Sequence, residues 1–426
     1  MQGYFFLLSS ESSNAILPRM IRVAGLRFKR TDIACSIGFL AYSSSAVMTP
    51  MCMLKLMEEL DFSLSDGGAI EIVRVALLLV VLVAGGIAAA RWGKPAVMMW
   101  GSFSLAVGMI CYAVAPAYAI VLAAMAFVGI GGGVIEGLVN PMVQDAHPEE
   151  SGQYLNVVNA FWSVGILSTV LITGILLTRG VSWRLLMASS GVLGVVAGIV
   201  FWRLRETRRP GLSSDAEPSR AEVGESLGQI RSVLIKKRFW VFASAMFFGA
   251  GAEGAFTFWS ASYIQLYYRA LPNAAGFGTA IFAGGMIAGR MLSGRYVRQK
   301  GLRTLILISA LIGIGVSGLV YVVGTVGGFY VVLFGAGLSV ACFWPSLQSY
   351  AADCLSVDTT MLFILLSCGG IPGFGIASWL MGIIGDSAGI RAGFAVIPVF
   401  LCFLASIIWI DFLVHRTSLQ SAPESM

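Results

Sequence analysis

The sequence contains few charged residues. Only 12% of its 426 residues are Asp, Glu, Lys or Arg, whereas soluble domains carry about 25%. At the same time 57% of the residues are hydrophobic, and the mean hydropathy is +0.84. A chain with so few charges cannot cover a surface that faces water. The composition therefore excludes a soluble globular protein and indicates that most of the chain lies in lipid.

Histidines and paired cysteines are also scarce. The two histidines, His147 and His415, fall in segments that we expect to face the cytoplasm, which excludes a histidine proton relay inside the membrane. The seven cysteines are scattered and form no C-x-x-C motif, so neither a zinc site nor a disulfide framework is predicted. The sequence also shows no nucleophile–base pair, metal cluster or phosphate-binding loop. We therefore expect no enzyme, no cofactor and no metal site.

What the sequence does contain is a series of long uncharged segments. A membrane-spanning helix needs about 20 mostly apolar residues. Runs of this kind cover 33–54, 75–90, 95–135, 151–178, 185–202, 239–252, 254–268, 270–289, 304–352, 359–385 and 392–410. Two runs are too long for one crossing and are divided at Pro116 and at 324–327, whereas the two runs around Glu253 join into one. The series predicts an all-α membrane protein with twelve transmembrane helices.

The basic residues predict how these helices are oriented. Lys and Arg are retained preferentially on the cytoplasmic side of a membrane. Most of the 28 basic residues fall in the segments 19–30, 91–94, 203–238 and 290–303, which share one side if both termini are cytoplasmic. The net charge of +6 then reflects topology and lipid contact, and no nucleic-acid partner is expected. We expect a monomeric multi-pass protein of the plasma membrane, in contact with the lipid bilayer.

Two similar halves are separated by a polar linker. The segment 205–238 is rich in charge, serine and proline, which is typical of a linker. Short motifs recur in the two halves, so that Gly93 corresponds to Gly301 and Pro141 to Pro345. The predicted organisation is a cytoplasmic lead at 1–30, six-helix bundles at 31–205 and 237–416, a linker at 206–236 and a cytoplasmic tail at 417–426. Carriers built from such repeats bind their solute between the halves, near the middle of the bilayer.

The loops after the second and eighth helices resemble those of a known family. "GIAAARWGK" at 86–94 resembles the G-x-L-a-D-r-x-G-r-k signature of the major facilitator superfamily, and "GRYVRQKGLR" at 294–303 resembles its second copy. Ala90 and Arg298 stand where the signature has Asp. The resemblance implies two pseudo-symmetric six-helix bundles and a gating role for the loops. The signature positions are Gly86, Arg91, Gly93, Lys94, Gly294, Arg298, Gly301 and Arg303.

Within this superfamily the sequence resembles the fucose:proton symporter family. The similar segments are "IEGLVNP" at 135–141, "GAGAEGAFTFWSASYI" at 249–264, "ACFWPSLQS" at 341–349 and "CGGIPGFGIASWLMGIIGDSAG" at 368–389. The resemblance implies proton-coupled uptake of a sugar or a sugar derivative. Symporters of this family carry an Asp in the first helix, where this chain has Ala46. One of the two carboxylates of the family is therefore missing.

Two glutamates are the candidate proton-coupling residues. Glu136 and Glu253 are isolated charges within long uncharged segments. An ionised carboxylate in hydrocarbon costs on the order of a few kcal/mol, so it faces a cavity or a partner, or it is protonated. Burial favours the neutral form of a carboxyl group. Such a glutamate can carry a proton; the alternative is a glutamate fixed permanently to a neighbouring donor.

Polar and aromatic residues on the same helices are the candidate solute-binding residues. Asn140 follows Glu136 by one helical turn, and Thr257 follows Glu253 by one turn, so each shares the face of its glutamate. Amides and hydroxyls suit the hydroxyl groups of a sugar but also join helices, and tryptophans stack on sugars or serve as packing. The predicted set is Glu136, Asn140, Asn156, Asn159, Trp162, Glu253, Thr257, Trp259, Trp344 and Gln348.

Glu71 and Arg74, spaced i, i+3, open the predicted second helix on the outer side. Two interpretations of this pair remain open. It forms a local salt bridge whose long side chains reach the membrane interface, or Arg74 binds a carboxylate of the solute.

Three functions are compatible with these features. The first is proton-coupled uptake of a small polar solute by alternating access, with sodium as an alternative coupling ion. The second is export of amphipathic compounds; exporters of this superfamily usually carry a Gly-Pro motif in the fifth helix, whereas 164–177 contains no proline. The third is a membrane sensor that no longer transports, as the altered loops and the missing acid suggest.

Overall fold

The computed structural model describes residues 20–23, 26–147, 151–207, 230–296, 301–355, 357 and 359–420. Nearly all of this part of the chain is helical. A two-stranded antiparallel hairpin, β1 (Met20–Val23) paired with β2 (Leu26–Lys29), precedes the first helix. The hairpin lies in the segment that the sequence analysis treats only as a lead, because two four-residue strands are too short for a clear period-2 pattern.

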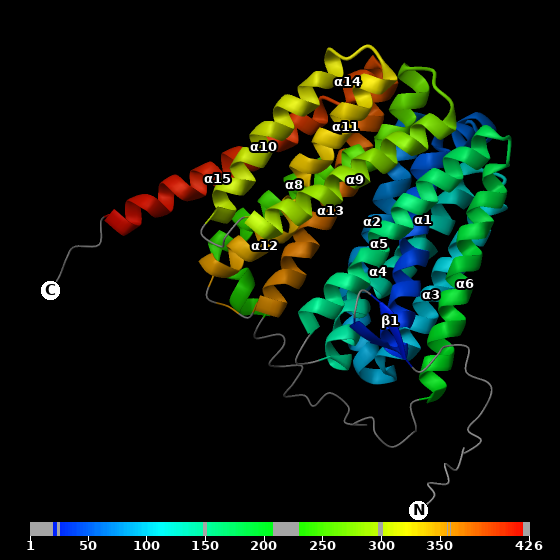
Figure 1. The fold of residues 1–426 in the computed structure, drawn as a ribbon, viewed down its shortest axis with the longest axis horizontal. Coiled ribbons are helices and arrows are strands. Elements are labelled where there is room, and N and C mark those ends of the chain that lie inside the picture. Colours follow the sequence, from blue (N-terminus) through cyan, green and yellow to red (C-terminus); the bar gives the residue numbers. More distant parts are fainter. Residues whose placement is uncertain are drawn as a thin grey trace, which may run out of the picture.

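The first half of the chain forms one bundle of helices (Figure 1). Its members are α1 (Arg30–Leu60), α2 (Leu64–Trp92), α3 (Lys94–Ala113), α4 (Tyr118–Ala146), α5 (Ser151–Thr178) and α6 (Trp183–Thr207). The break between α3 and α4 surrounds Pro116, as predicted.

The second half forms the other bundle. Its members are α8 (Lys237–Tyr267), α9 (Pro272–Tyr296), α10 (Leu302–Gly318) with the 3₁₀ turn η2 (Leu319–Tyr321), α11 (Val326–Val340), α12 (Phe343–Cys354), α13 (Thr359–Ala388), α14 (Ile390–Gly393) and α15 (Val396–Gln420). The break before α11 falls at 322–325 and overlaps the predicted division at 324–327. A second break, at 341–342 before Pro345, separates α11 from α12 within a single crossing.

Eleven helical segments in the described residues are long and apolar enough to cross a membrane. α2 is also long enough, at 29 residues, but it carries Asp66, Glu71 and Arg74 in its first half. Together with α2 the segments account for the twelve predicted crossings.

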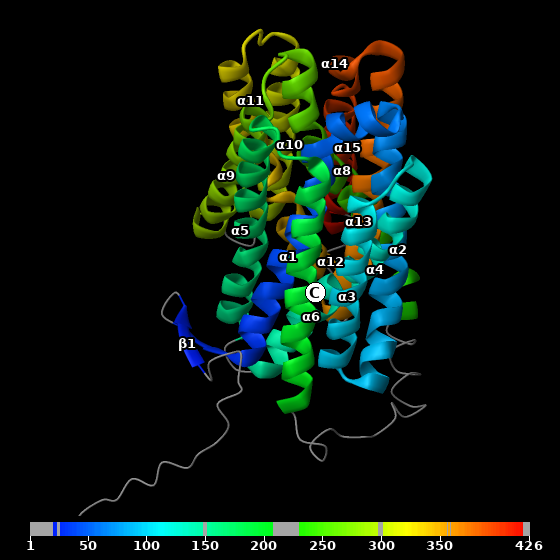
Figure 2. The same cartoon turned by 90° about the vertical axis from the view of Figure 1, so that its right-hand side faces the viewer.

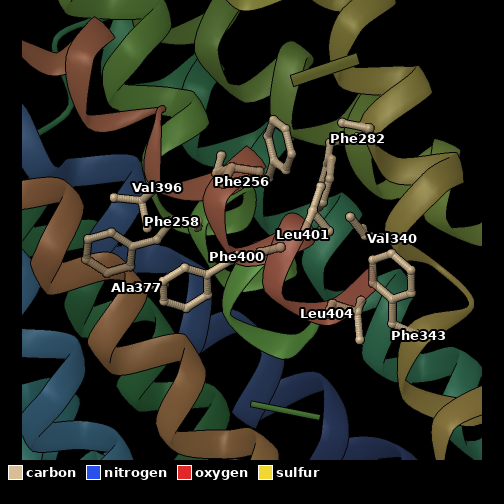
Figure 3. Packing of buried hydrophobic residues seen from close by; sticks show 14 of the residues in the cluster. Phe256, Phe258, Phe282, Val340, Phe343, Ala377, Val396, Phe400, Leu401 and Leu404 are labelled. Atoms are coloured by element: carbon tan, nitrogen blue, oxygen red, sulfur yellow. The ribbon is translucent and has the colours of Figure 1, made fainter. Parts of the chain in front are cut away.

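Each bundle has its own apolar core. In the first bundle Tyr112, Trp183 and Phe201 are buried among methionines and leucines. In the second, Phe256, Phe282 and Phe343 pack between α8, α9, α12 and α15 (Figure 3). Most residues of each core come from one half, although a few, such as Val170 and Ile371, pack into the core of the other half. Each half can therefore behave as a body with its own packing.

The glycine stripe of α4 packs against α2 inside the first bundle. A Cβ atom at Gly129 would lie 2.4 Å from the Arg74 carbonyl oxygen, and one at Gly133 would lie 2.7 Å from the Leu78 carbonyl oxygen. Small residues therefore let the two backbones touch. This contact fixes the position of Arg74 relative to Glu136, which lies on the same helix as the stripe.

The two bundles touch at the end of the molecule that includes α14 (Figure 1). There α2 lies against α13, and α5 lies against α9 (Figure 2). A Cβ atom at Gly68 would lie 2.7 Å from the Ser378 carbonyl oxygen, and one at Gly276 would lie 2.3 Å from the Val170 carbonyl oxygen. At these two glycines the backbones of the two bundles touch directly.

Three hydrogen bonds join the bundles at the same end. The carboxylate of Asp386, on α13, accepts the backbone N–H groups of Leu64 and Ser65 at the start of α2, each at 2.8 Å. The backbone N–H of Asn273 donates to the Thr178 hydroxyl, also at 2.8 Å. Toward the other end, where β1 lies, the helices of the two bundles diverge (Figure 1).

The contact at Gly68 gives a first testable prediction. Gly68→Val places a side chain against the backbone of α13, and overpacking of this kind costs about 1–3 kcal/mol. We expect a lower midpoint of thermal unfolding in detergent. Gly85→Val is the matched control on the same helix, because a Cβ atom at Gly85 meets no atom within 4 Å. Equal midpoints for the two variants would show that α2 and α13 do not touch at Gly68.

Candidate functional site

A cavity of about 300 Å³ lies between the two bundles. Its walls come from α1, α2, α4 and α5 on one side and from α8, α9, α12 and α13 on the other. Six of the residues predicted from the sequence line it: Glu136, Asn159, Trp162, Glu253, Thr257 and Trp344. Residues more than 200 positions apart in the chain therefore meet at one site.

The cavity contains a buried ion pair on α2. The Nε of Arg74 donates to a Glu71 carboxylate oxygen at 2.8 Å, and Nη2 donates to the other oxygen. Nη1 donates to the Tyr42 hydroxyl at 3.3 Å. Glu71 and Arg74 are 6% and 8% exposed. The pair is a local salt bridge, as one interpretation held, but it lies in the cavity and not at the membrane interface, because this face of α2 points between the bundles.

A second, looser ion pair comes from α8 and α9. Nη2 of Arg290 lies 3.6 Å from a Glu253 carboxylate oxygen, which is beyond the usual hydrogen-bond distance. The Arg290 side chain is 42% exposed. From the sequence Arg290 is expected in a loop, because an uncharged run ends there. α9 continues to Tyr296, so Arg290 belongs to the helix and faces the cavity.

Glu136 is the third glutamate of the cavity and belongs to neither ion pair. It lines the cavity and makes no hydrogen bond or ion pair with any residue that the structure describes. Arg74 attracts it through space, although its donors already bind Glu71 and Tyr42. Of the charged residues in the lining, three are glutamates and two are arginines. With both pairs intact, the charge of the cavity therefore depends on whether Glu136 is protonated.

Aromatic rings form much of the wall. Trp162 packs against Tyr42, with ring centroids 4.7 Å apart, and against Phe39 at 6.2 Å. On the opposite bundle Trp344 contacts Phe374 at 6.3 Å. These rings offer flat apolar surfaces on both sides of the charged groups. Ala46, where the fucose:proton symporters have an Asp, also lines the cavity and adds no charge.

Four predicted solute-binding residues lie elsewhere or cannot be placed. The Trp259 side chain is fully buried and its indole N–H donates to the Ser378 carbonyl at 2.9 Å, which is a packing role. Gln348 donates to Phe363 and Ser367 and so joins α12 to α13. Asn140 is exposed and accepts from Asn159 at 2.9 Å, outside the cavity lining. Asn156 belongs to α5, but its side chain lies outside the described residues.

The exposed amides show where the cavity meets solvent. Asn159 lines the cavity and is exposed, as is its partner Asn140, which lies one turn beyond Glu136 toward the end of α4. The bundles close the opposite end. Water therefore reaches the cavity from the end that carries β1. In the predicted orientation this end faces the cytoplasm.

The signature loops lie at this open end. Gly93 links α2 to α3 with φ +80°, a conformation that glycine adopts without strain. Lys94 forms an ion pair with Asp145 at 2.7 Å, and Arg91 is exposed beside Trp92. In the second copy Arg303 lies 3.6 Å from the ring centroid of Phe412. Gly86 is within α2, Gly294 within α9 and Gly301 directly before α10, while Arg298 lies outside the described residues.

A sequence profile of the Major Facilitator Superfamily matches residues 34–325, which is more than half of the chain. The chain belongs to the major facilitator superfamily. The all-α fold with two bundles of transmembrane helices is thereby confirmed. No curated protein sequence matches this superfamily member.

Solved structures of a transporter share the fold of this superfamily member. One is a bacterial homologue of the human lysosomal transporter Spinster in its inward-facing and occupied conformation, with 15% identity and a TM-score of 0.68 over 91% of this chain and 97% of the other. The other is the inward-facing and unoccupied conformation, with 14% identity and a TM-score of 0.74 over 92% and 97%. At such identities the likeness concerns the fold alone.

Membership has direct consequences for function. The chain is a multi-pass membrane protein and a secondary transporter that works by alternating access on a small-molecule substrate. The prediction that it is a transporter and not an enzyme is confirmed. Carriers with two such bundles generally bind their solute between the halves, near the middle of the bilayer.

The buried pair on α2 gives a second testable prediction. Glu71→Gln leaves Arg74 charged and without its main partner in a buried site, which costs about 3–5 kcal/mol. We expect a marked loss of stability against thermal unfolding in detergent. Glu58→Gln removes one acid of the exposed Lys55–Glu58 pair, where the expected cost is about 0–1 kcal/mol. A Glu71→Gln protein as stable as the Glu58→Gln protein would contradict the buried pair.

Proposed function

We propose that this superfamily member couples the transport of a small solute to protons, and that Glu136 binds the proton. The observation that carries the proposal is that Glu136 faces the cavity without a hydrogen-bonding or ionic partner among the described residues. A carboxylate without a counter-ion resists removal from water. A bound proton removes that charge and lets the bundles close around the solute.

The closed end supports alternating access with this cavity as the solute site. The structure holds one end shut through α2–α13 and α5–α9, while exposed residues lead from the cavity to the other end. In the proposed cycle the contact alternates between the two ends. Glu136 meets water on one side at a time, so that a proton taken up on one side is released on the other. We further propose that the signature loops form part of the gate at the open end.

The solute is a small molecule with polar groups. The resemblance to the fucose:proton symporters favours a sugar or sugar derivative. The rings of Trp162 and Trp344 line the cavity and would offer it stacking surfaces. A second candidate, proton-coupled export of amphipathic compounds, is favoured by the apolar walls that Phe39, Phe374 and their neighbours provide. We propose uptake across the plasma membrane by a monomer with both termini in the cytoplasm.

The proton site gives a third testable prediction. The protein is reconstituted in liposomes that contain a pH-sensitive dye, and a solute that raises its thermal stability is selected from sugars, sugar acids and amphipathic acids and amines. Adding this solute to the wild type should drive proton movement. Glu136→Gln, which is permanently neutral, should abolish that movement but retain exchange of labelled against unlabelled solute across the membrane.

Controls separate this proposal from its alternatives. Glu58→Gln, which changes an exposed acid outside the cavity, should leave proton movement unchanged. Unchanged coupling in Glu136→Gln would overturn the assignment of the proton site. Coupling that follows an imposed sodium gradient would replace the proton with sodium. Binding without any flux would favour a sensor that no longer transports.

A further inference from the structure

The two arginines of the cavity differ in how many of their guanidinium N–H donors are hydrogen-bonded. All three nitrogens of the Arg74 guanidinium donate to Glu71 or Tyr42, and the side chain is buried. Arg290 has looser contacts: its Nε lies 3.4 Å from the Ala341 carbonyl oxygen, and its Nη2 lies 3.6 Å from Glu253. A guanidinium carries five N–H donors. Arg290 therefore has donors to spare, on a side chain that is 42% exposed and lines the cavity.

We propose that Arg290 binds a carboxylate group of the transported solute and that Glu253 is its resident counter-ion, which the solute replaces. This inference rests on the proposed function in one respect, that the cavity is the solute site. Arginine presents its donors in a planar fork that matches a carboxylate, and two parallel hydrogen bonds are stronger than a single contact at 3.6 Å. The hydrogen bonds between the solute carboxylate and Arg290 are thus stronger than the Arg290–Glu253 contact that they replace.

The surroundings of Arg290 indicate the rest of the solute. Met286 and Ile287 precede it by four and three residues on α9, so they share its face, and both line the cavity. Trp344 and Phe374 also line the cavity from the same bundle. A carboxylate at Arg290 therefore has apolar surfaces beside it. The solute class that fits is an organic monocarboxylic acid with an aromatic or aliphatic body.

The exchange also explains why a glutamate is paired with Arg290. Among the described residues, the charged and titratable groups that face Glu253 are Arg290 from α9 and the Cys342 thiol between α11 and α12. The same cavity also contains Tyr42, Glu71, Arg74 and Glu136. When the solute carboxylate binds Arg290, Glu253 loses its ion-pair partner and is neutralised by taking up a proton from the solvent. One negative charge has replaced another beside Arg290, so binding of the solute leaves the net charge of the cavity unchanged, and enclosure still depends on the proton on Glu136.

Matched pairs of probes test the inference. Each acid is compared with its neutral amide: benzoate with benzamide, phenylacetate with phenylacetamide, and hexanoate with hexanamide. The readout is the rise in the midpoint of thermal unfolding as a function of probe concentration, measured on the full-length protein in detergent. For the wild type we expect at least one acid to raise the midpoint while its amide does not.

Three substitutions identify the residues responsible. Arg290→Gln should weaken binding of that acid by about tenfold or more, because a charge-assisted pair is lost. Glu253→Gln should strengthen it, since the competing carboxylate is gone. Arg231→Gln removes an exposed arginine outside the cavity and should leave binding of the acid unchanged. Arg290→Lys, which keeps the charge but not the fork, should give an intermediate affinity.

The outcomes also separate this inference from the proposed function. The inference is overturned if no acid stabilises the wild type, if the amide binds as well, or if Arg290→Gln binds the acid unchanged. Proton-coupled flux of a neutral sugar that depends on Glu136 would then leave the transport proposal intact. Conversely, if acid binding depends on Arg290 while flux of the acid stays coupled to protons in Glu136→Gln, the proposed proton site is overturned and this inference stands.

Discussion

The structure depends on one constraint: a charged side chain inside a membrane must be paired or must reach water. Five charged residues within the spanning helices, Glu71, Arg74, Glu136, Glu253 and Arg290, gather on one cavity between the bundles. Two pairs satisfy four of them, and the fifth faces the open space. The bundles cannot form a water-free interface over these charged side chains. Their apolar side chains are buried mainly inside each bundle. The need to keep these charges in contact with water thus maintains a cavity in the middle of the molecule.

Much of this arrangement could be predicted from the sequence, because some of its signals are local. Glu136 and Glu253 stand out as single charges in apolar runs. Pro116 marks a helix end, since proline lacks the N–H group that a helix interior requires. Membership of the superfamily is likewise supported by short motifs in the loops. Each of these features depends only on residues that are close in sequence.

The remainder depends on tertiary contacts that no local pattern encodes. Arg290 reads as a loop residue because an uncharged run ends there, although α9 continues past it. Trp259 and Trp344 both lie in apolar segments and are equally plausible solute-binding residues from the sequence. In the fold, Trp259 on α8 is buried in the core, whereas Trp344 on α12 lines the cavity. Glu71 and Arg74 read as an interfacial pair because the position of α2 beside α13 cannot be inferred from α2 alone. Which face of a helix meets the cavity is decided by its neighbours.

The bond between Asp386 and α2 has a consequence for how readily the closed end opens. The start of α2 already has its own cap, because the Ser63 hydroxyl accepts the Asp66 N–H and the Asp66 carboxylate accepts the Ser63 N–H. Asp386 adds two further bonds to N–H groups that would otherwise meet solvent. If the bundles separate there, water can hydrogen-bond to the Asp386 carboxylate and to the two backbone N–H groups. The first turn of α2 stays formed, because its own cap is unaffected. The two hydrogen bonds that Asp386 adds to the packed helices are therefore ones that hydration replaces at small net cost, so they oppose separation at this end only weakly.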